Sequence, residues 1–215
     1  MNVADIMWKV RARVPFTGLN IISHVLDKKN KIILDVGCGS GGPIVFLNRN
    51  QVFNVVCADI FKPYLEQCKK KLPDSCCVLC DARALPFSEK SFDTVLCIEV
   101  LEHLEKEEGL RAIAALEQVA RKQVILATPL HHYKQSAYDN NPYQEHKYIW
   151  RSSELKNLGY RVITFGMRGI SDNVYLGKRA DIVFVFKNGL WVLAGPLTRL
   201  FPNLAGHMVC VKQIG

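Results

Sequence analysis

The sequence has no long hydrophobic run. Its longest apolar-leaning stretch, residues 189–197, contains Pro196 and is far shorter than the roughly 20 residues that a membrane-spanning helix needs. Residues 1–5 already include the acidic Asp5, and no continuous apolar segment follows them. A secretory signal peptide has a basic start and such a segment. We therefore expect no transmembrane segment and a cytoplasmic location.

Internal repeats, low-complexity segments and linkers rich in serine, glycine or proline are absent as well. Charged residues make up 22% of the chain and are interspersed with a 49% hydrophobic share, which excludes global disorder. The 215 residues can bury a sizeable core, so we expect a single domain over residues 1–215. The net charge of +8 favours an anionic partner such as nucleic acid or a lipid head group, although the basic residues are scattered.

A disulfide framework is not expected, because the eight cysteines of a cytoplasmic chain are typically reduced. The pattern Cys76-Cys77-x-x-Cys80 resembles half of a zinc site, but no second cysteine pair and no nearby histidine completes four ligands. We interpret these thiols as buried strand residues.

The chain does contain short β-branched runs that alternate with helical patterns, which predicts a parallel, doubly wound α/β sheet. The predicted strands cover residues 31–36, 51–58, 76–80, 92–98, 124–127, 161–166 and 207–212, and the predicted helices cover residues 62–72, 105–120 and 151–158. Residues 181–186 also have strand propensity, but we prefer 207–212 as the closing strand.

Two helices carry sequence signals for their faces and ends. The 3.6-residue period of residues 105–120 places four apolar side chains toward the core, namely Leu110, Ile113, Leu116 and Val119. Residues 151–158 begin with Ser152 or Ser153 as a candidate N-cap and end at Gly159.

We divide the expected domain into an N-terminal helical segment (1–30), a cofactor-binding half (31–128), a lid or acceptor loop (129–150) and a C-terminal half (151–215). A loop of this length is uncommon in a compact domain and is usually functional. It carries side chains that can stack on an acceptor or pack the lid itself: Gln135, Tyr138, Asn141, Tyr143 and Trp150.

The motif Gly37-x-Gly39-x-x-Gly42 follows the first predicted strand and suits a ligand at a helix N-terminus. A dinucleotide and S-adenosylmethionine both fit this motif. Asp35 favours the second, because its carboxylate can accept from a cationic amino group. Asp59 ends the second strand about 20 residues after Gly39, where a ribose acceptor belongs in either interpretation. Asp81 ends the third strand, where an acceptor could meet an adenine amino group.

In combination these motifs resemble the class I S-adenosylmethionine-dependent methyltransferases. The matching pieces stand in the family's order: Asp35-Val-Gly-Cys-Gly-Ser-Gly-Gly42, Asp59, Asp81-Ala82, Leu85-Pro-Phe87, Phe92-Asp93 and Glu99-Val-Leu-Glu-His-Leu104. The resemblance implies a single Rossmann-like domain whose seven-stranded, mostly parallel sheet has an antiparallel last strand and helices on both faces. It implies S-adenosylmethionine as the cofactor, held by Asp35, Gly37, Cys38, Gly39, Gly41, Asp59, Ile60, Asp81, Ala82 and Glu99.

Glu99, Glu102 and His103 stand at i, i+3 and i+4 and would share one face of a helical turn. With His146 as a fourth ligand they could hold Mg²⁺ or Mn²⁺. The arrangement resembles the metal-dependent small-RNA 3′-end 2′-O-methyltransferases and some ubiquinone-pathway O-methyltransferases. Metal-free members share the same motif, however, with the first glutamate capping a helix and the histidine packing locally.

Two further histidines, His131 and His132, follow the fifth strand at the ligand-bearing edge of the sheet. Together with His103 they are the candidates for a general base or substrate contact. The alternative for the pair is a polar loop with two solvated side chains.

The expected function is methyl transfer from S-adenosylmethionine to oxygen or nitrogen of a small or lipid-like acceptor. Two alternatives stay open, a metal-assisted RNA ribose 2′-O-methyltransferase and a non-catalytic cofactor-binding interaction protein. A dehydrogenase is disfavoured by the segment from Asp81 to Phe87. Peripheral membrane contact through residues 8–13 or 187–199 also stays open, and the sequence does not fix the oligomeric state.

Overall fold

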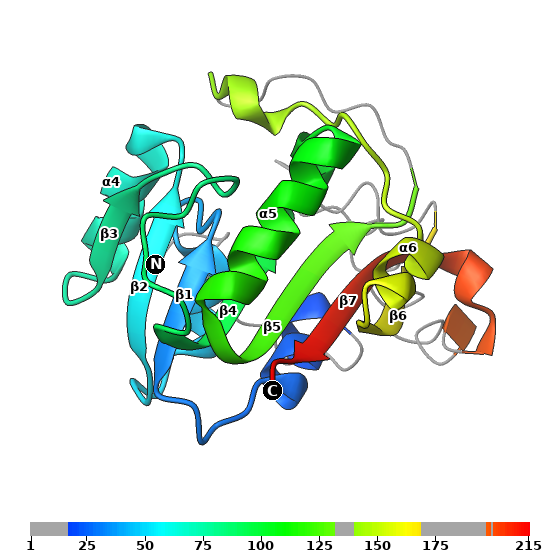
Figure 1. The fold of residues 1–215 in the computed structure, drawn as a ribbon, viewed down its shortest axis with the longest axis horizontal. Coiled ribbons are helices and arrows are strands. Elements are labelled where there is room, and N and C mark those ends of the chain that lie inside the picture. Colours follow the sequence, from blue (N-terminus) through cyan, green and yellow to red (C-terminus); the bar gives the residue numbers. More distant parts are fainter. Residues whose placement is uncertain (1–16, 132–139, 169–196, 199) are drawn as a thin grey trace, which may run out of the picture.

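A seven-stranded sheet runs through the molecule in the order β3-β2-β1-β4-β5-β7-β6 (Figure 1). The computed structural model describes residues 17–131, 140–168, 197–198 and 200–215. The strands are β1 Ile32–Val36, β2 Asn54–Asp59, β3 Cys76–Leu79, β4 Phe92–Ile98, β5 Ala120–Pro129, β6 Arg161–Met167 and β7 Ala205–Gln213.

The first five strands are mutually parallel, and β7 is antiparallel to both of its neighbours, β5 and β6. The predicted fold class, with an antiparallel last strand, is therefore confirmed. Residues 207–212 lie within β7, as predicted, while the competing residues 181–186 lie outside the described part of the chain.

Helices cover both faces of the sheet. The described helices are α2 Gly18–Val25, α3 Gly42–Leu47, α4 Lys62–Lys71, α5 Lys106–Val119 and α6 Ser152–Asn157. The first three pack on one face through side chains such as Ile22, Ile44 and Leu65. On the other face α5 crosses in front of the sheet (Figure 1), and Leu116 of α5 and Leu155 of α6 join the core there.

Three local predictions were wrong. Strand β5 begins earlier than residue 124, because Arg121 and Lys122 at its exposed start both pair with the buried Asp93 on β4. Leu110 on α5 is 38% exposed, and Ala112 takes a core position instead. The N-cap of α6 is Arg151, whose backbone N–H donates to Glu154 Oε2 at 2.9 Å, so Ser152 and Ser153 lie inside the helix.

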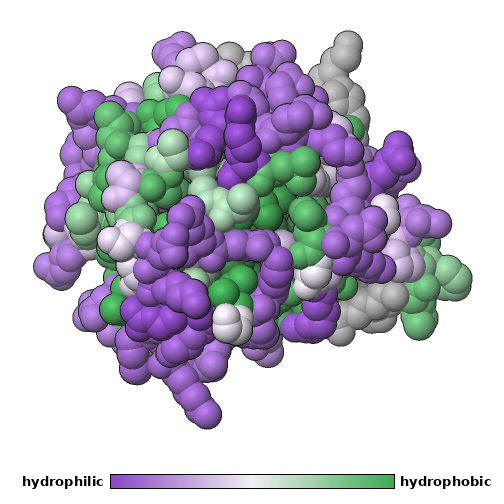
Figure 2. All heavy atoms as spheres, in the orientation of Figure 1, coloured by the Kyte–Doolittle hydropathy of each residue, from purple (hydrophilic) through white to green (hydrophobic). Residues whose placement is uncertain are grey.

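No helix in the described ranges is both long enough and apolar enough to cross a bilayer. Polar side chains dominate the face seen in Figure 2, with apolar patches at the left, near the centre and at the right-hand edge, the last over the segment drawn orange in Figure 1. That segment contains four exposed apolar side chains, Leu197, Leu200, Phe201 and Leu204. Residues 8–13 and most of 187–199 lie outside the described part.

Candidate functional site

The site lies where the strand order of the sheet reverses. Strands β1 and β4 are neighbours at the centre, and the chain continues from them toward opposite edges of the sheet. A doubly wound sheet has its ligand crevice at the carboxyl ends of two such strands. The glycine-rich loop, residues 37–41, follows β1, and Glu99 follows β4.

Glycine is required at the start of this loop. Gly37 has φ +71°, and a Cβ there would lie 2.1 Å from Val100 Cγ2. The N–H groups of Gly37 and Cys38 donate to the Ala58 carbonyl on β2, at 2.8 and 3.1 Å. The loop thus turns tightly across the ends of β1 and β2. At Gly39 a Cβ would meet no atom within 4 Å, so the backbone there is open to a ligand.

Asp59, at the end of β2, ties the loop to the next turn. Its Oδ2 accepts from Gly39 N–H and its Oδ1 from Phe61 N–H, both at 2.8 Å. Burial raises the pKa of this carboxyl above its usual range, against the lowering effect of these N–H groups. A carboxylate has about four acceptor positions, so two are left for the hydroxyl pair of a ribose. Ile60 follows, half-buried.

Asp35, inside β1, is 2% exposed. Its Oδ2 is buried and has no hydrogen-bond partner among the described residues. Burial, with added repulsion from Cys68 and Asp59, raises the pKa of this carboxyl to about 8. A buried carboxylate of this kind is costly unless a cation lies beside it, so Asp35 fits the ammonium group of a methionine moiety.

Asp81, after β3, is held by Arg83. Its Oδ1 accepts from the Arg83 backbone N–H at 2.8 Å, and both carboxylate oxygens accept from the guanidinium. The hydrogen bonds from Arg83 hold the pKa of Asp81 below its usual range. Arg83 also pairs with Glu108 on α5. An adenine amino group would share Asp81 with this arginine, and Ala82 is half-buried beside it.

The second cluster lies just beyond β4, in the 3₁₀ helix η1 Leu101–His103. One ligand atom each from Glu102, His103 and His146 lies within 4.8 Å of the other two. Glu99 does not share their helical turn, because it precedes η1 with φ +55°. The structure therefore brings together three of the four predicted ligands, and the expectation of a common helical face was wrong for Glu99.

His146 reaches the cluster because its segment is hydrogen-bonded to η1. The N–H groups of Lys147 and Tyr148 donate to the Glu102 carbonyl at 2.7 and 3.2 Å. His103 Nδ1 lies 3.1 Å from the Glu145 carbonyl oxygen, and the rings of His103 and His146 meet edge-on with centroids 4.9 Å apart.

Trp150 ends this segment as a core residue. It is fully buried, and its Nε1–H donates to the Leu101 carbonyl at 3.2 Å. Of the two expected roles, stacking on an acceptor and packing the lid itself, the burial of Trp150 fits only packing. Asn141 is also buried and accepts from Tyr143 N–H in a local turn, while Tyr143 itself is 48% exposed.

Burial shifts the pKa values of both Glu102 and His103. Glu102 is 1% exposed, its Oε2 accepts from Thr128 Oγ1 at 3.1 Å, and its Oε1 has no partner among the described residues. Burial, then the nearby Glu99, raises the pKa of Glu102 well above its usual range. Burial lowers the pKa of His103, which favours the neutral ring that a metal needs.

Comparison with known proteins identifies the domain. Residues 34–128 match the family described as "Methyltransferase domain", and this stretch contains the glycine-rich loop, Asp35, Asp59, Asp81 and Glu99. Over these residues the chain matches a methyltransferase domain. A putative methyltransferase from Bacillus halodurans has the same fold, with a TM-score of 0.60 and 16% identity over 91% of this chain and 97% of that one.

The curated relatives match less than half of this chain. An uncharacterized protein of Methanocaldococcus jannaschii is 34% identical over 46% of this chain and 42% of its own length. A probable tRNA methyltransferase 9B of Homo sapiens is 30% identical over 44% of this chain and 19% of its own length. The chain thus matches less than half the length of these relatives.

Two residues that hold site carboxylates were not predicted from the sequence, and some predicted residues lie outside the described ranges. Arg83 and Thr128 hold Asp81 and Glu102, respectively, but an arginine after β3 and a threonine near the end of β5 carry no sequence signal that distinguishes them beforehand. His131 is half-buried directly after β5, whereas His132, Gln135 and Tyr138 lie outside the described residues. The roles of both histidines stay predictions.

Proposed function

We propose that this chain transfers a methyl group from S-adenosylmethionine to an acceptor at the carboxyl edge of the sheet. The observation that supports it most is the orphaned, buried carboxylate of Asp35 beside an open glycine-rich loop. A doubly wound domain that binds a neutral ligand has no need of such a group.

Each cofactor residue has a distinct task in this proposal. Asp35 neutralises the ammonium group, the backbone of residues 37–41 faces the methionine part, and Asp59 accepts from the ribose hydroxyls. Ile60, Asp81 and Ala82 hold the adenine, and Glu99 lies beside the reactive centre. The bound cofactor supplies an electrophilic methyl group, so the protein chiefly aligns the acceptor and excludes water.

Titration calorimetry tests the cofactor. Binding of S-adenosylmethionine to the full chain is expected, with no heat from a nicotinamide dinucleotide. Asp59→Asn should weaken binding by about tenfold, because one charge-assisted hydrogen-bond acceptor is lost. Glu89→Gln, a carboxylate that hydrogen-bonds to Gln118 at the surface, is the control. Failure of the wild type to bind would overturn the proposal.

The proposed acceptor is oxygen or nitrogen of a small or lipid-like molecule. The exposed apolar side chains of residues 197–204 support a lipid-like acceptor or peripheral contact with a membrane surface. Where the acceptor is a hydroxyl, a base must remove its proton, and His131, His132 and His103 are the proposed candidates.

A metal-assisted RNA ribose 2′-O-methyltransferase is the second candidate. The cluster of Glu102, His103 and His146 supports it, because a carboxylate oxygen and two imidazoles suit a divalent ion, Mn²⁺ better than Mg²⁺. Glu99, which lies close enough to raise the pKa of Glu102, is the proposed fourth ligand. Such an ion would supply Lewis-acid stabilisation of an acceptor oxygen. A relative named as a probable tRNA methyltransferase points to the same class of acceptor.

One experiment separates these acceptors. Labelled methyl transfer into fractionated lipids, RNA and small metabolites is measured with and without a chelator. Label in lipid or metabolite, unchanged by the chelator, supports the first candidate, and chelator-sensitive label in RNA supports the second. Cofactor binding without label in any fraction supports the remaining alternative, a non-catalytic cofactor-binding protein.

A further inference from the structure

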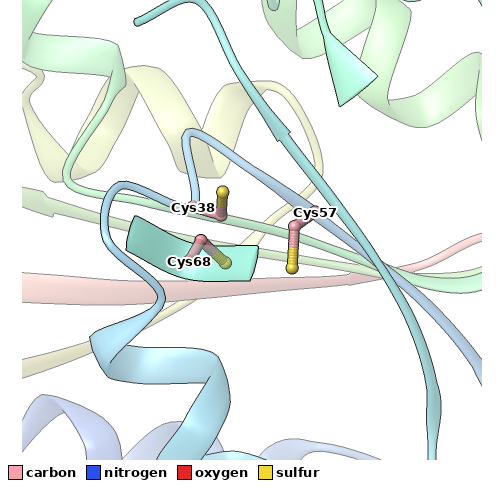
Figure 3. Close-up of side chains that lie close together, drawn as sticks. All are labelled: Cys38, Cys57 and Cys68. Carbon is pink, nitrogen blue, oxygen red and sulfur yellow. The ribbon is translucent and has the colours of Figure 1, made fainter. Parts of the chain in front are cut away.

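Three buried thiols meet directly beneath the glycine-rich loop. Cys38 lies in the loop, Cys57 on β2 and Cys68 on α4 (Figure 3), and we call them the thiol cluster. Their Sγ atoms all lie within 4.8 Å of one another, and each residue is at most 3% exposed. In a tetrahedral zinc–thiolate site with Zn–S bonds of about 2.3 Å, neighbouring sulfurs are about 3.8 Å apart. The cluster therefore needs only small side-chain adjustments to reach that geometry.

A fourth thiol borders the cluster. Cys77 on β3 is the register partner of Cys57 on the parallel strand β2, so both side chains emerge on the same face of the sheet. Cys77 packs against the core that contains the cluster, and its Sγ lies 3.8 Å from Ser75 Oγ; it is not among the sulfurs that all lie within 4.8 Å of one another. Cys77 thus borders the three clustered sulfurs and is the nearest candidate for a fourth ligand from another segment of the chain.

We propose that the thiol cluster binds a soft metal ion of the zinc class, with Cys77 as the fourth sulfur ligand. Binding replaces the thiol protons, so that one Zn²⁺ and four thiols give a tetrathiolate complex of charge −2 and four released protons. The ammonium groups of Lys69 and Lys71 lie near Cys77 and Cys68, respectively, and offset part of this charge, although burial outweighs Lys69 and raises the pKa of Cys77. The carboxyls of Asp35 and Asp59 face the cluster from the strands, and their negative charge disfavours a negatively charged complex there.

Other buried cysteines of this chain only pack in the core and do not meet further ligand atoms among the described residues. Cys97 and Cys210 are fully buried on the opposite face of the sheet, and neither belongs to a group of ligand atoms within the described residues. Cys76 is exposed. The interpretation of Cys76, Cys77 and Cys80 as buried strand thiols was therefore wrong for Cys76, and Cys77 and Cys80 are only half-buried.

Metal at this place would act on the loop above it. A Cβ at Gly41 would lie 2.9 Å from Cys68 Sγ, so the loop rests directly on the cluster. Cys38 belongs to the loop itself. An ion that joins Cys38 to α4 and β2 would fix the backbone of residues 37–41, with no need for any contact to the cofactor.

Cadmium titration of the reduced, metal-free full chain tests the site. Cd²⁺ bound by thiolates gives an ultraviolet charge-transfer band whose intensity scales with the number of sulfur ligands, whereas oxygen and nitrogen ligands at Glu102 and His146 give none. The expected result is one Cd²⁺ per chain with the intensity of three or four thiolates. Absence of the band, or an intensity of one or two thiolates, would overturn the proposal. This measurement uses the wild-type chain and so does not depend on the folding of any variant.

Alanine variants then locate the ion. Cys57→Ala and Cys68→Ala should each weaken Cd²⁺ binding by more than about 100-fold, since loss of a ligand exceeds the 10- to 100-fold cost of losing an outer-shell partner. Cys97→Ala and Cys210→Ala are matched controls, equally buried but outside the cluster, and should leave the affinity unchanged. Equal affinity in both pairs would overturn the assignment. Cofactor binding, measured separately, decides the proposed methyl transfer independently.

Discussion

The indole ring of Trp150 occupies the space that a side chain at Gly109 would need. A Cβ at Gly109 on α5 would lie 2.5 Å from Trp150 Cζ2, and the indole N–H is fixed by the Leu101 carbonyl. Helix α5 therefore approaches the segment that carries His146 only because residue 109 has no side chain.

Gly109→Ala should lower the free energy of unfolding by about 1–3 kcal/mol, the usual cost of overpacking a filled core. The higher helix propensity of alanine recovers less than about 1 kcal/mol of this. Urea unfolding followed by circular dichroism measures the difference. Ala114→Gly, on a partly exposed stretch of the same helix, calibrates the propensity effect. A variant at 109 as stable as the wild type would show that the indole can move.

Asp93 should make stability depend on acid pH. It accepts from the N–H groups of Lys31 and Ile32 and pairs with Lys122, which lowers its pKa to about 2. Because the unfolded-state pKa is near 3.9, its contribution of about 2 kcal/mol is complete above that value and is lost as pH falls toward 2.

Asp93→Asn tests this contribution. At pH 7 the variant should unfold at lower urea concentration than the wild type, and the difference should shrink as pH falls from 4 to 2. Unfolding curves at several pH values measure it. A difference independent of pH would mean that packing of the side chain, and not its charge, stabilises the fold.

Binding of S-adenosylmethionine should release a proton near neutral pH. The cofactor-free Asp35 has a pKa of about 8, so it is largely protonated at pH 7. An ammonium group beside it favours the ionised form, and affinity should therefore increase as pH rises from 6 to 8. Calorimetry at pH 7 in buffers of different ionisation enthalpy counts the protons. Asp35→Asn should bind more weakly and release none, and equal release from both proteins would contradict the assignment.

Arg83→Ala should weaken cofactor binding by several-fold without loss of stability beyond about 1 kcal/mol. The arginine orients Asp81 through three side-chain hydrogen bonds, so its removal frees the proposed adenine acceptor to rotate. Competition with adenosine reports on the adenine half alone. Arg121→Ala, which contacts Asp93 far from the site, is the control. Unchanged adenosine affinity would mean that Asp81 pairs with Arg83 but does not bind the adenine.

His146→Ala should abolish Mn²⁺ binding and leave cofactor affinity intact, because one of the two imidazoles of the cluster is lost. Manganese-enhanced water relaxation measures the ion directly. Gln144→Ala on the same segment is the control. Equal Mn²⁺ uptake by His146→Ala and the wild type would remove the metal-assisted candidate.

Much of the architecture was predictable because it rests on local patterns. Buried strands such as residues 92–98 read as apolar runs, and the tight turn at Gly37 requires glycine. Contacts between distant segments were not predictable from spacing alone. Trp150 is an aromatic residue in a loop sequence, and only the three-dimensional packing on Gly109 makes it core. Cys57 and Cys68 are 11 positions apart without a metal-binding spacing, yet α4 places them together.

The Glu102 carbonyl accepts from two N–H groups of the segment that carries His146, so η1 and this segment are joined by hydrogen bonds. If a ligand that orders this segment changes the affinity of an ion at Glu102 by some factor, the ion changes the affinity of that ligand by the same factor, by thermodynamic reciprocity. Acceptor and ion would thus be coupled ligands, and the strength of that coupling is measurable without observing a single turnover.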